Sequence, residues 1–175
     1  MELMEFMANR RSVRLYTDEP VSEEAVDQIL KAGMLGPSGK GIAPWSFIVI
    51  RDKEMLKKLH GCRKGGAKLF DTADCAIAVL GNTDLSDTCV EDCSVSLAMM
   101  HLMASSLGIG SCWLQNRLRP SDEEGVDSQT FVRSLLGFPE NQMLEAMLIL
   151  GHPAQDPAPH DPDALPKDKI HFEKW

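Results

Sequence analysis

The longest helical pattern in this sequence, from about Asp87 to Leu107, is apolar on nearly every side. Apolar and small residues recur along it at steps of three and four: Cys89, Cys93, Ser96, Leu97, Met100, Ala104 and Leu107. A second set widens this apolar surface: Val90, Val95, Ala98, Met99 and Met103. A surface helix would instead show one apolar stripe and one polar face. We therefore expect this helix to be central in the fold or shared with a second subunit.

Shorter apolar runs predict four β-strands. Trp45 to Ile50 is an apolar run of strand length, which predicts a strand that is buried on both faces. The other strands are expected at Cys75–Leu80, from Gly108–Trp113 to about Leu114, and at Met143–Leu150. Further helices are expected at Glu2–Asn9, after a cap at Ser22, at Asp52–His60 and at Thr130–Leu136.

The chain shows no internal repeat and no domain boundary, which predicts one domain over residues 1–175. Its last part, residues 154–175, contains Pro157, Pro159, Pro162 and Pro166 and should be a mostly extended tail. Because apolar residues remain at its end, we expect this tail to lie across a surface.

The composition excludes several classes of protein. A net charge of -8 argues against a nucleic-acid binder and against a polybasic membrane surface. No apolar run approaches the roughly 18 residues of a membrane span, and the N-terminus lacks the basic start of a signal peptide. These features predict a cytoplasmic protein.

Five cysteines at irregular spacing favour reduced thiols over a disulfide framework. Cys89 and Cys93 lie one helical turn apart and, with His60 or Cys62, could hold a metal or act as a redox sensor. No second paired spacing completes a tetrahedral site, so buried thiols are the favoured interpretation and no metal is predicted.

Three arginines and a hydroxyl group occur within six residues, from Asn9 to Arg14. Guanidinium groups bind phosphate oxygens in forked pairs and stay protonated. The cluster therefore predicts an anionic small molecule. The alternative is a solvated helix end whose arginines pair with surrounding carboxylates.

Two other segments do not match the nucleotide-binding motifs that they partly resemble. Gly108–Trp113 lacks the third glycine of a dinucleotide fingerprint, and Gly39-Lys40 lacks the following Ser or Thr of a phosphate loop.

Four sequence elements in a set order resemble the nitroreductase family of flavin enzymes. They are Arg10-Arg-Ser-Val-Arg14 with Tyr16 and Pro20-Val21; Gly36-Pro-Ser-Gly39 leading to Pro44-Trp45 and Phe47–Ile50; Leu107–Trp113; and Leu136-Gly-Phe-Pro139 ahead of Leu148–Pro153. The resemblance spans nearly the whole chain.

The resemblance implies an α+β sandwich with a mostly antiparallel central sheet flanked by helices. It also implies an intertwined homodimer that binds FMN without a covalent bond at the subunit interface. Such an enzyme takes electrons from NAD(P)H and reduces nitroaromatic, quinone-like or other electron-poor molecules. The flavin carries the chemistry, so no catalytic side chain is predicted.

The family motifs also assign candidate site residues by position. Arg10, Arg11, Ser12 and Arg14 would hold the FMN phosphate and ribityl chain. Pro37, Ser38, Gly39 and Lys40 would come from the other subunit and edge the isoalloxazine ring. Leu114 and Gln115 would cover one ring face and offer a backbone N–H to flavin N5.

Two departures from the family pattern motivate an alternative function. The Asn and Gln that often precede the family's tryptophan are Gly41 and Ala43 here. An FMN-binding or FMN-storage protein without its own nicotinamide-driven turnover is therefore the second hypothesis. Many short members of the family also carry a basic residue in a proline-rich tail that closes on the phosphate, whereas this chain has His160 there, followed by Lys167 and Lys169.

Other cations have both a functional and a solvated interpretation. The basic segment Lys57, Lys58, Arg63, Lys64 and Lys68 could meet the extra phosphate of a nicotinamide cofactor, although a solvated face is favoured. Arg117 and Arg119 could line the substrate side of the flavin or face water.

Overall fold

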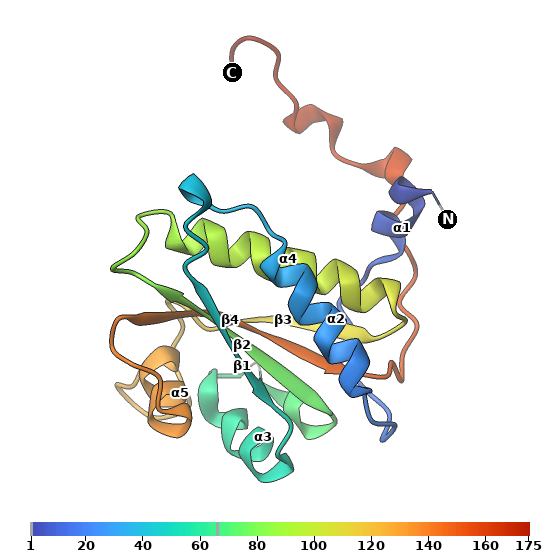
Figure 1. Ribbon diagram of the computed structural model, residues 1–175. Helices are drawn as coiled ribbons and strands as arrows, with labels where there is room; N and C mark the ends of the chain where they lie inside the picture. The colour runs from blue at the N-terminus through green and yellow to red at the C-terminus, as the bar shows by residue number, and fades with distance from the viewer. Residues whose placement is uncertain (1, 66) are drawn as a thin grey trace.

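The computed structural model describes residues 2–65 and 67–175, and its centre is a four-stranded sheet (Figure 1). The strands are β1 (Trp45–Ile50), β2 (Cys75–Asn82), β3 (Gly110–Gln115) and β4 (Gln142–Gly151). Their order is β1-β2-β4-β3, and all three pairs are antiparallel. The predicted α+β fold with an antiparallel sheet is confirmed.

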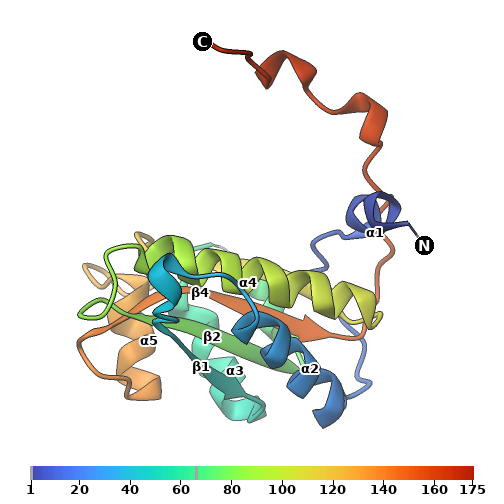
Figure 2. The same cartoon turned by 45° about the horizontal axis from the view of Figure 1, so that its top comes forward.

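Four of the five described α-helices cover the sheet, two on each face. The helices are α1 (Leu3–Asn9), α2 (Glu23–Met34), α3 (Lys53–Leu59), α4 (Cys89–Ser106) and α5 (Ser128–Leu136). Figures 1 and 2 show α2 and α4 on one face and α3 and α5 on the other. Three of the helix starts have side-chain caps, because Ser22, Asp52 and Asp127 each accept a first-turn N–H.

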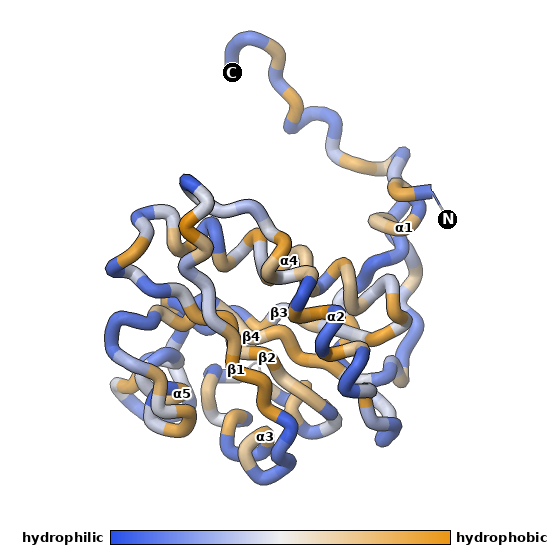
Figure 3. Tube along the Cα trace, in the orientation of Figure 1, coloured by the Kyte–Doolittle hydropathy of each residue, from blue (hydrophilic) through white to orange (hydrophobic). Residues whose placement is uncertain are grey.

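Alternate residues of β2 feed two separate cores. Cys75, Ile77 and Val79 pack with α2 and α4, whereas the residues between them pack with α3 and α5. The hydrophobic part of the trace accordingly follows the strands, as Figure 3 shows. Of the described helices, none has both the length and the hydrophobicity needed to cross a membrane.

The prediction that Trp45–Ile50 is buried on both faces is wrong. Among the described residues, β1 is an edge strand that pairs only with β2. Ser46 is exposed, Val49 is 39% exposed, and Ile50 is buried. A run of apolar residues does not distinguish an edge strand from a central one, since that depends on which strands later in the chain pair with it.

The long helix α4 is central, but one side of it is bare in the single chain. Cys93, Leu97 and Met100 are fully buried against the sheet, as predicted. Val95 and Met99, on the outer side, are 38% and 36% exposed. The expected central position is therefore confirmed, and the sharing of this helix with a second subunit stays a prediction.

α4 approaches β2 closely at Gly81. A Cβ atom built on Gly81 would lie 2.2 Å from Cys89 Sγ and 2.6 Å from Cys93 Sγ. All five cysteines are free and buried. Burial raises the pKa of the thiols, to about 12 for Cys62 and Cys75, so they pack as small apolar groups. Within residues 2–65 and 67–175, no group of three or more His, Cys, Asp or Glu residues could hold a metal ion.

Both ends of the chain leave the body of the fold on the same side (Figures 1 and 2). The N–H of His160 donates to the carbonyl of Ala8 in α1 at 2.9 Å. Beyond residue 157 every tail residue is exposed, including Phe172 at 84% and Trp175 at 100%. The expectation that the tail lies across a surface is therefore wrong for the single chain, because its apolar residues meet no groove in the described part of it.

We predict that Gly81→Ala destabilises the fold by about 1–3 kcal/mol through overpacking against the two thiols. Its cost should shrink in a Cys89→Ala/Cys93→Ala background, because the sulfur atoms that the new methyl group meets are then absent. Urea unfolding of the four proteins measures this coupling. An equal cost in both backgrounds would contradict the packing explanation.

Candidate functional site

The arginine loop, residues 10–14, follows α1 and is attached to the start of β3. Ser12 and Ser111 form a parallel bridge, and the N–H of Val13 donates to the carbonyl of Ser111 at 2.9 Å. Sequence positions about 100 residues apart are thereby brought side by side. The loop lies along the edge of β3 that faces away from β4.

Arg10 contacts a buried histidine of α4. Its Nη1 lies 2.9 Å from His101 Nε2, and His101 Nδ1 forms a hydrogen bond with Ser111 Oγ. Burial, and then the charge of Arg10, lowers the pKa of His101 to about 4, so the imidazole is neutral at pH 7. Sequence reasoning missed His101, because a lone histidine in a helical pattern carries no signal of its partner.

Arg11 and Arg14 line two different cavities. Arg11 lines one of about 150 Å³ with Ser105, the start of β3 and the segment from Gln155 to Pro157. Arg14 lines another of about 560 Å³ together with Lys68. The basic segment thus brings one lysine to the arginine loop.

Burial, and then the nearby Arg11 charge, lowers the pKa of Arg10. An anion between the two guanidinium groups would offset their mutual repulsion.

The free edge of β3 presents backbone donors. In an antiparallel strand the N–H and C=O of one residue point to the same side, and successive residues alternate. The carbonyl of Ser111 points to the free edge, where it accepts the N–H of Val13. The N–H groups of Trp113 and Gln115 therefore point to that edge as well, whereas Leu114 points its N–H toward β4 and buries its side chain.

A polar network at the end of β3 holds the side chain of Gln115. Its Oε1 accepts from Trp113 Nε1 at 2.8 Å, and its Nε2 donates to Glu145 Oε1 at 3.1 Å. Glu145 is the extra residue of a β-bulge in β4, between the partners of Val79 and Leu80. It was missed as well, although a glutamate inside the apolar run of β4 was a visible signal.

One oxygen of this buried glutamate lacks a hydrogen-bond partner. Glu145 is 4% exposed, and its Oε2 makes no hydrogen bond within the described chain. It forms an ion pair with Arg117, whose Nε lies 3.9 Å from it. A buried carboxylate oxygen is costly unless it is hydrogen-bonded. Within the described chain this oxygen is therefore balanced by the ion pair with Arg117 alone.

The predicted ring-edging loop is held at the other end of α4. The N–H of Gly39 donates to Asp92 Oδ1 at 2.8 Å, and the buried Asp92 also accepts from Ser86 and Thr88. A Cβ on Gly39 would lie 2.2 Å from Thr88 Oγ1, so only glycine fits this approach. Pro37 and Lys40 are exposed beside it.

The same loop closes on itself where the family's Asn and Gln are missing. The N–H of Ala43 donates to Ser38 Oγ at 2.9 Å. Lys40, Gly41 and Ala43 all have positive φ, between 52° and 69°, which is uncommon for residues with a side chain. Gly41 and Ala43 are exposed, so they supply a tight turn and no polar side chain.

One chain does not bring the two groups of predicted residues together. Arg10 is attached to His101 and Gly39 to Asp92, nine positions apart on α4. At ~1.5 Å per residue these attachment points are about 14 Å apart along the helix. The arginine loop and the start of β3 form one group, and residues 37–40 form another.

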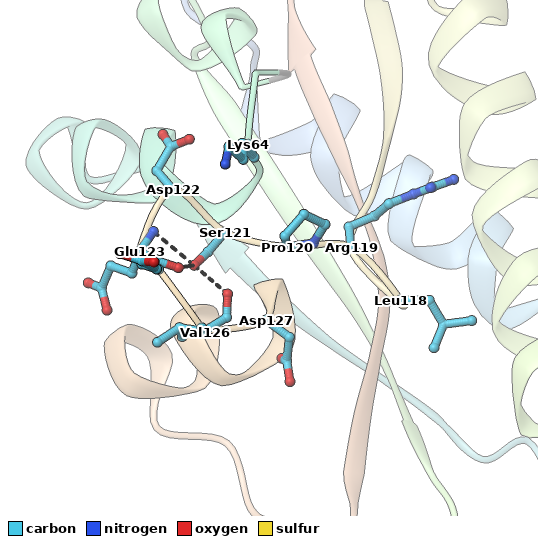
Figure 4. Close-up of a pocket in the computed structure, with 11 residues that line it drawn as sticks. Lys64, Leu118, Arg119, Pro120, Ser121, Asp122, Glu123, Val126 and Asp127 are labelled. Atoms are coloured by element: carbon cyan, nitrogen blue, oxygen red, sulfur yellow. Dashed lines mark hydrogen bonds between the residues drawn. The ribbon is translucent and has the colours of Figure 1, made fainter.

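A further open cavity of about 710 Å³ lies between Lys64 and the loop from Leu118 to Asp127. Its lining has two cations, Lys64 and Arg119, and four carboxylates: Asp122, Glu123, Glu124 and Asp127. Figure 4 shows the side chains of Arg119 and Leu118 extending away from Asp122 and Glu123. An excess of negative charge does not suit a phosphate, so this cavity is not the anion site.

The chain is similar to known proteins in both sequence and fold. A sequence model of the Nitroreductase family matches residues 7–62. A protein of Archaeoglobus fulgidus, assigned as an NADH dehydrogenase/NAD(P)H nitroreductase, is 38% identical, with 99% of each chain covered. The structure of an FMN-dependent nitroreductase from Clostridium difficile superimposes with a TM-score of 0.95 at 34% identity, covering 99% of this chain and 100% of that one.

A second similar structure contains a ligand. It comes from Desulfovibrio desulfuricans, is assigned as a nitroreductase in complex with FMN, and has a TM-score of 0.78 at 27% identity. The match covers 99% of this chain and 97% of that one. Because these similarities extend over the whole chain, the protein belongs to the nitroreductase family.

Proposed function

We propose that this protein is an FMN-dependent oxidoreductase that uses NAD(P)H to reduce nitroaromatic, quinone-like or other electron-poor small molecules. The observation that carries the proposal is the free edge of β3, with cations at its start and an outward backbone N–H at Gln115. Ser111 and Gln115 are four residues apart, about 13 Å at ~3.3 Å per residue. A cytoplasmic setting fits the supply of NAD(P)H and the free thiols.

The candidate residues fit FMN because the cations lie at the start of β3, where the phosphate would bind, and Gln115 lies at its end, where the ring would bind. Arg10, Arg11, Ser12 and Arg14 would hold the phosphate and the ribityl chain, and Lys68 adds a cation beside Arg14. The N–H of Gln115 would donate to flavin N5, while the buried Leu114 supports the strand beneath the ring. The bound flavin supplies the hydride transfer, and the chain positions it and tunes its environment.

The complete site is proposed to need two copies of the chain. Residues 37–40 belong to a group attached about 14 Å along α4 from the arginine loop, so they would serve the flavin of the partner. The exposed Val95 and Met99 of α4 offer an apolar surface for a homodimer. The tail, residues 154–175 of a single 1–175 domain, would lie on the second copy and bring His160, Lys167 or Lys169 to the phosphate.

The second candidate is an FMN-binding or FMN-storage protein without its own nicotinamide-driven turnover. It is favoured by one observation, the exposed Gly41 and Ala43 in place of polar side chains that would contact the ring. The Ser38–Ala43 hydrogen bond keeps the loop compact without them. The two candidates differ in whether a nicotinamide reduces the bound flavin.

We predict that the purified protein, loaded with FMN and freed of excess, shows a flavin absorption band that NADH or NADPH bleaches without oxygen. Bleaching, followed by reoxidation with a nitroaromatic or a quinone, supports the reductase. A stable band with both nicotinamides would favour the storage protein. No retained band would contradict the cofactor assignment.

We predict that Arg10→Ala and Arg14→Ala each weaken FMN binding by roughly 1.5–3 kcal/mol, the range for hydrogen bonds to charged groups. Fluorescence titration of the apoprotein measures the effect. Lys58→Ala is the matched control, since Lys58 is an exposed cation on α3 and should leave the affinity unchanged. If both arginine variants bind as tightly as the unaltered protein, the phosphate site lies elsewhere.

Mixing two defective variants tests the shared site. Arg10→Ala removes a cation from one group, and Pro37→Trp adds bulk to the exposed loop of the other. In a mixed dimer one of the two sites would be free of both substitutions, so unfolding and refolding the variants together should restore tight binding to about a quarter of all sites. The two variants refolded separately are the control. A site contained in one chain would show no recovery.

A further inference from the structure

His101 joins the arginine loop to β3 through both of its ring nitrogens. The imidazole is 8% exposed, with Arg10 Nη1 2.9 Å from Nε2 and Ser111 Oγ at Nδ1. The carbonyl of Ser111 in turn accepts the N–H of Val13 at 2.9 Å. A closed set of contacts thus runs from Arg10 through α4 and β3 and back to the arginine loop.

The chemistry of the partners determines which nitrogen of His101 carries the proton. Arginine has only donors and keeps its charge, so Nε2 must be the acceptor. The hydrogen of the neutral ring is then on Nδ1, which donates to Ser111 Oγ. A doubly protonated ring would turn an N–H toward the guanidinium and lose this contact.

We propose that His101, held by Ser111, is a positioning residue that orients the guanidinium of Arg10 toward a phosphate-bearing ligand. The proposal rests on the proposed function in taking FMN as that ligand. His101 occupies one N–H of Arg10 and leaves the others for phosphate oxygens. A free arginine would lose the entropy of many rotamers on binding, whereas one already held by His101 loses less.

Comparing FMN with riboflavin separates this role from a general structural one, because riboflavin lacks the phosphate. His101→Leu should weaken FMN binding on the order of 5- to 10-fold and leave riboflavin binding unchanged. His101→Gln, whose amide oxygen can accept the Arg10 N–H, should restore most of the FMN affinity. Adding His101→Leu to Arg10→Ala should cause no further loss, because both changes remove the same interaction.

Three results of these binding measurements would overturn the proposal: an equal loss of FMN and riboflavin affinity, no rescue by glutamine, or full additivity with Arg10→Ala. His152→Leu is the matched control. Its imidazole lies 3.8 Å from Glu19, and the change should alter neither affinity.

A measurement without ligand keeps the inference independent of the cofactor. Nitrogen-15 NMR of the imidazole should find hydrogen on Nδ1 of His101, and Arg10→Ala should shift the Nε2 resonance. A ring protonated at Nε2 would overturn the proposal, because Arg10 could not then donate to it. If the unaltered protein bound neither flavin, the FMN function would fail, while this spectrum would still decide whether His101 holds Arg10.

Discussion

The close packing of α4 on the sheet is the constraint on which the rest of the site depends. Gly81 lets the helix approach β2, and the buried face of α4 then sets where its polar side chains emerge. Near one end Asp92 holds Gly39, and nearer the other His101 holds Arg10. A shift of α4 along the sheet would therefore move both groups of candidate site residues at once.

The polar groups of the fold fall into satisfied and unsatisfied sets. Asp92 accepts three hydrogen bonds, and His101 uses both ring nitrogens. By contrast, the outward N–H groups of β3 lie at a free strand edge, and one oxygen of Glu145 lacks a hydrogen bond within the described chain. Buried polar groups without partners are costly, and within the described chain they are spread over several elements, with one such atom each in Asn116, Arg133, Gln142 and Glu145.

Local chemistry made most of the helices and strands predictable. Ser22 and Asp52 cap helices because a short polar side chain can accept a first-turn N–H, and this depends only on neighbouring residues. The same reasoning wrongly predicted that Trp45–Ile50 is buried on both faces, because an apolar run does not determine how many strands pair with it. It also failed for the tail, because apolar residues such as Phe172 and Trp175 are exposed and cover no surface of the described chain.

From the sequence alone, the cation cluster at the start of the chain and the family were accessible, because both lie in contiguous motifs, and the resemblance to the family implied the mostly antiparallel α+β fold. Only the tertiary structure decided which side chains meet. Arg10 and His101 are 91 positions apart, and Gly39 and Asp92 are 53 apart. The bulge that buries Glu145 is likewise a property of the pairing between β2 and β4. Such contacts follow from how helices and strands register against one another, and that register is set by the packing of the whole core.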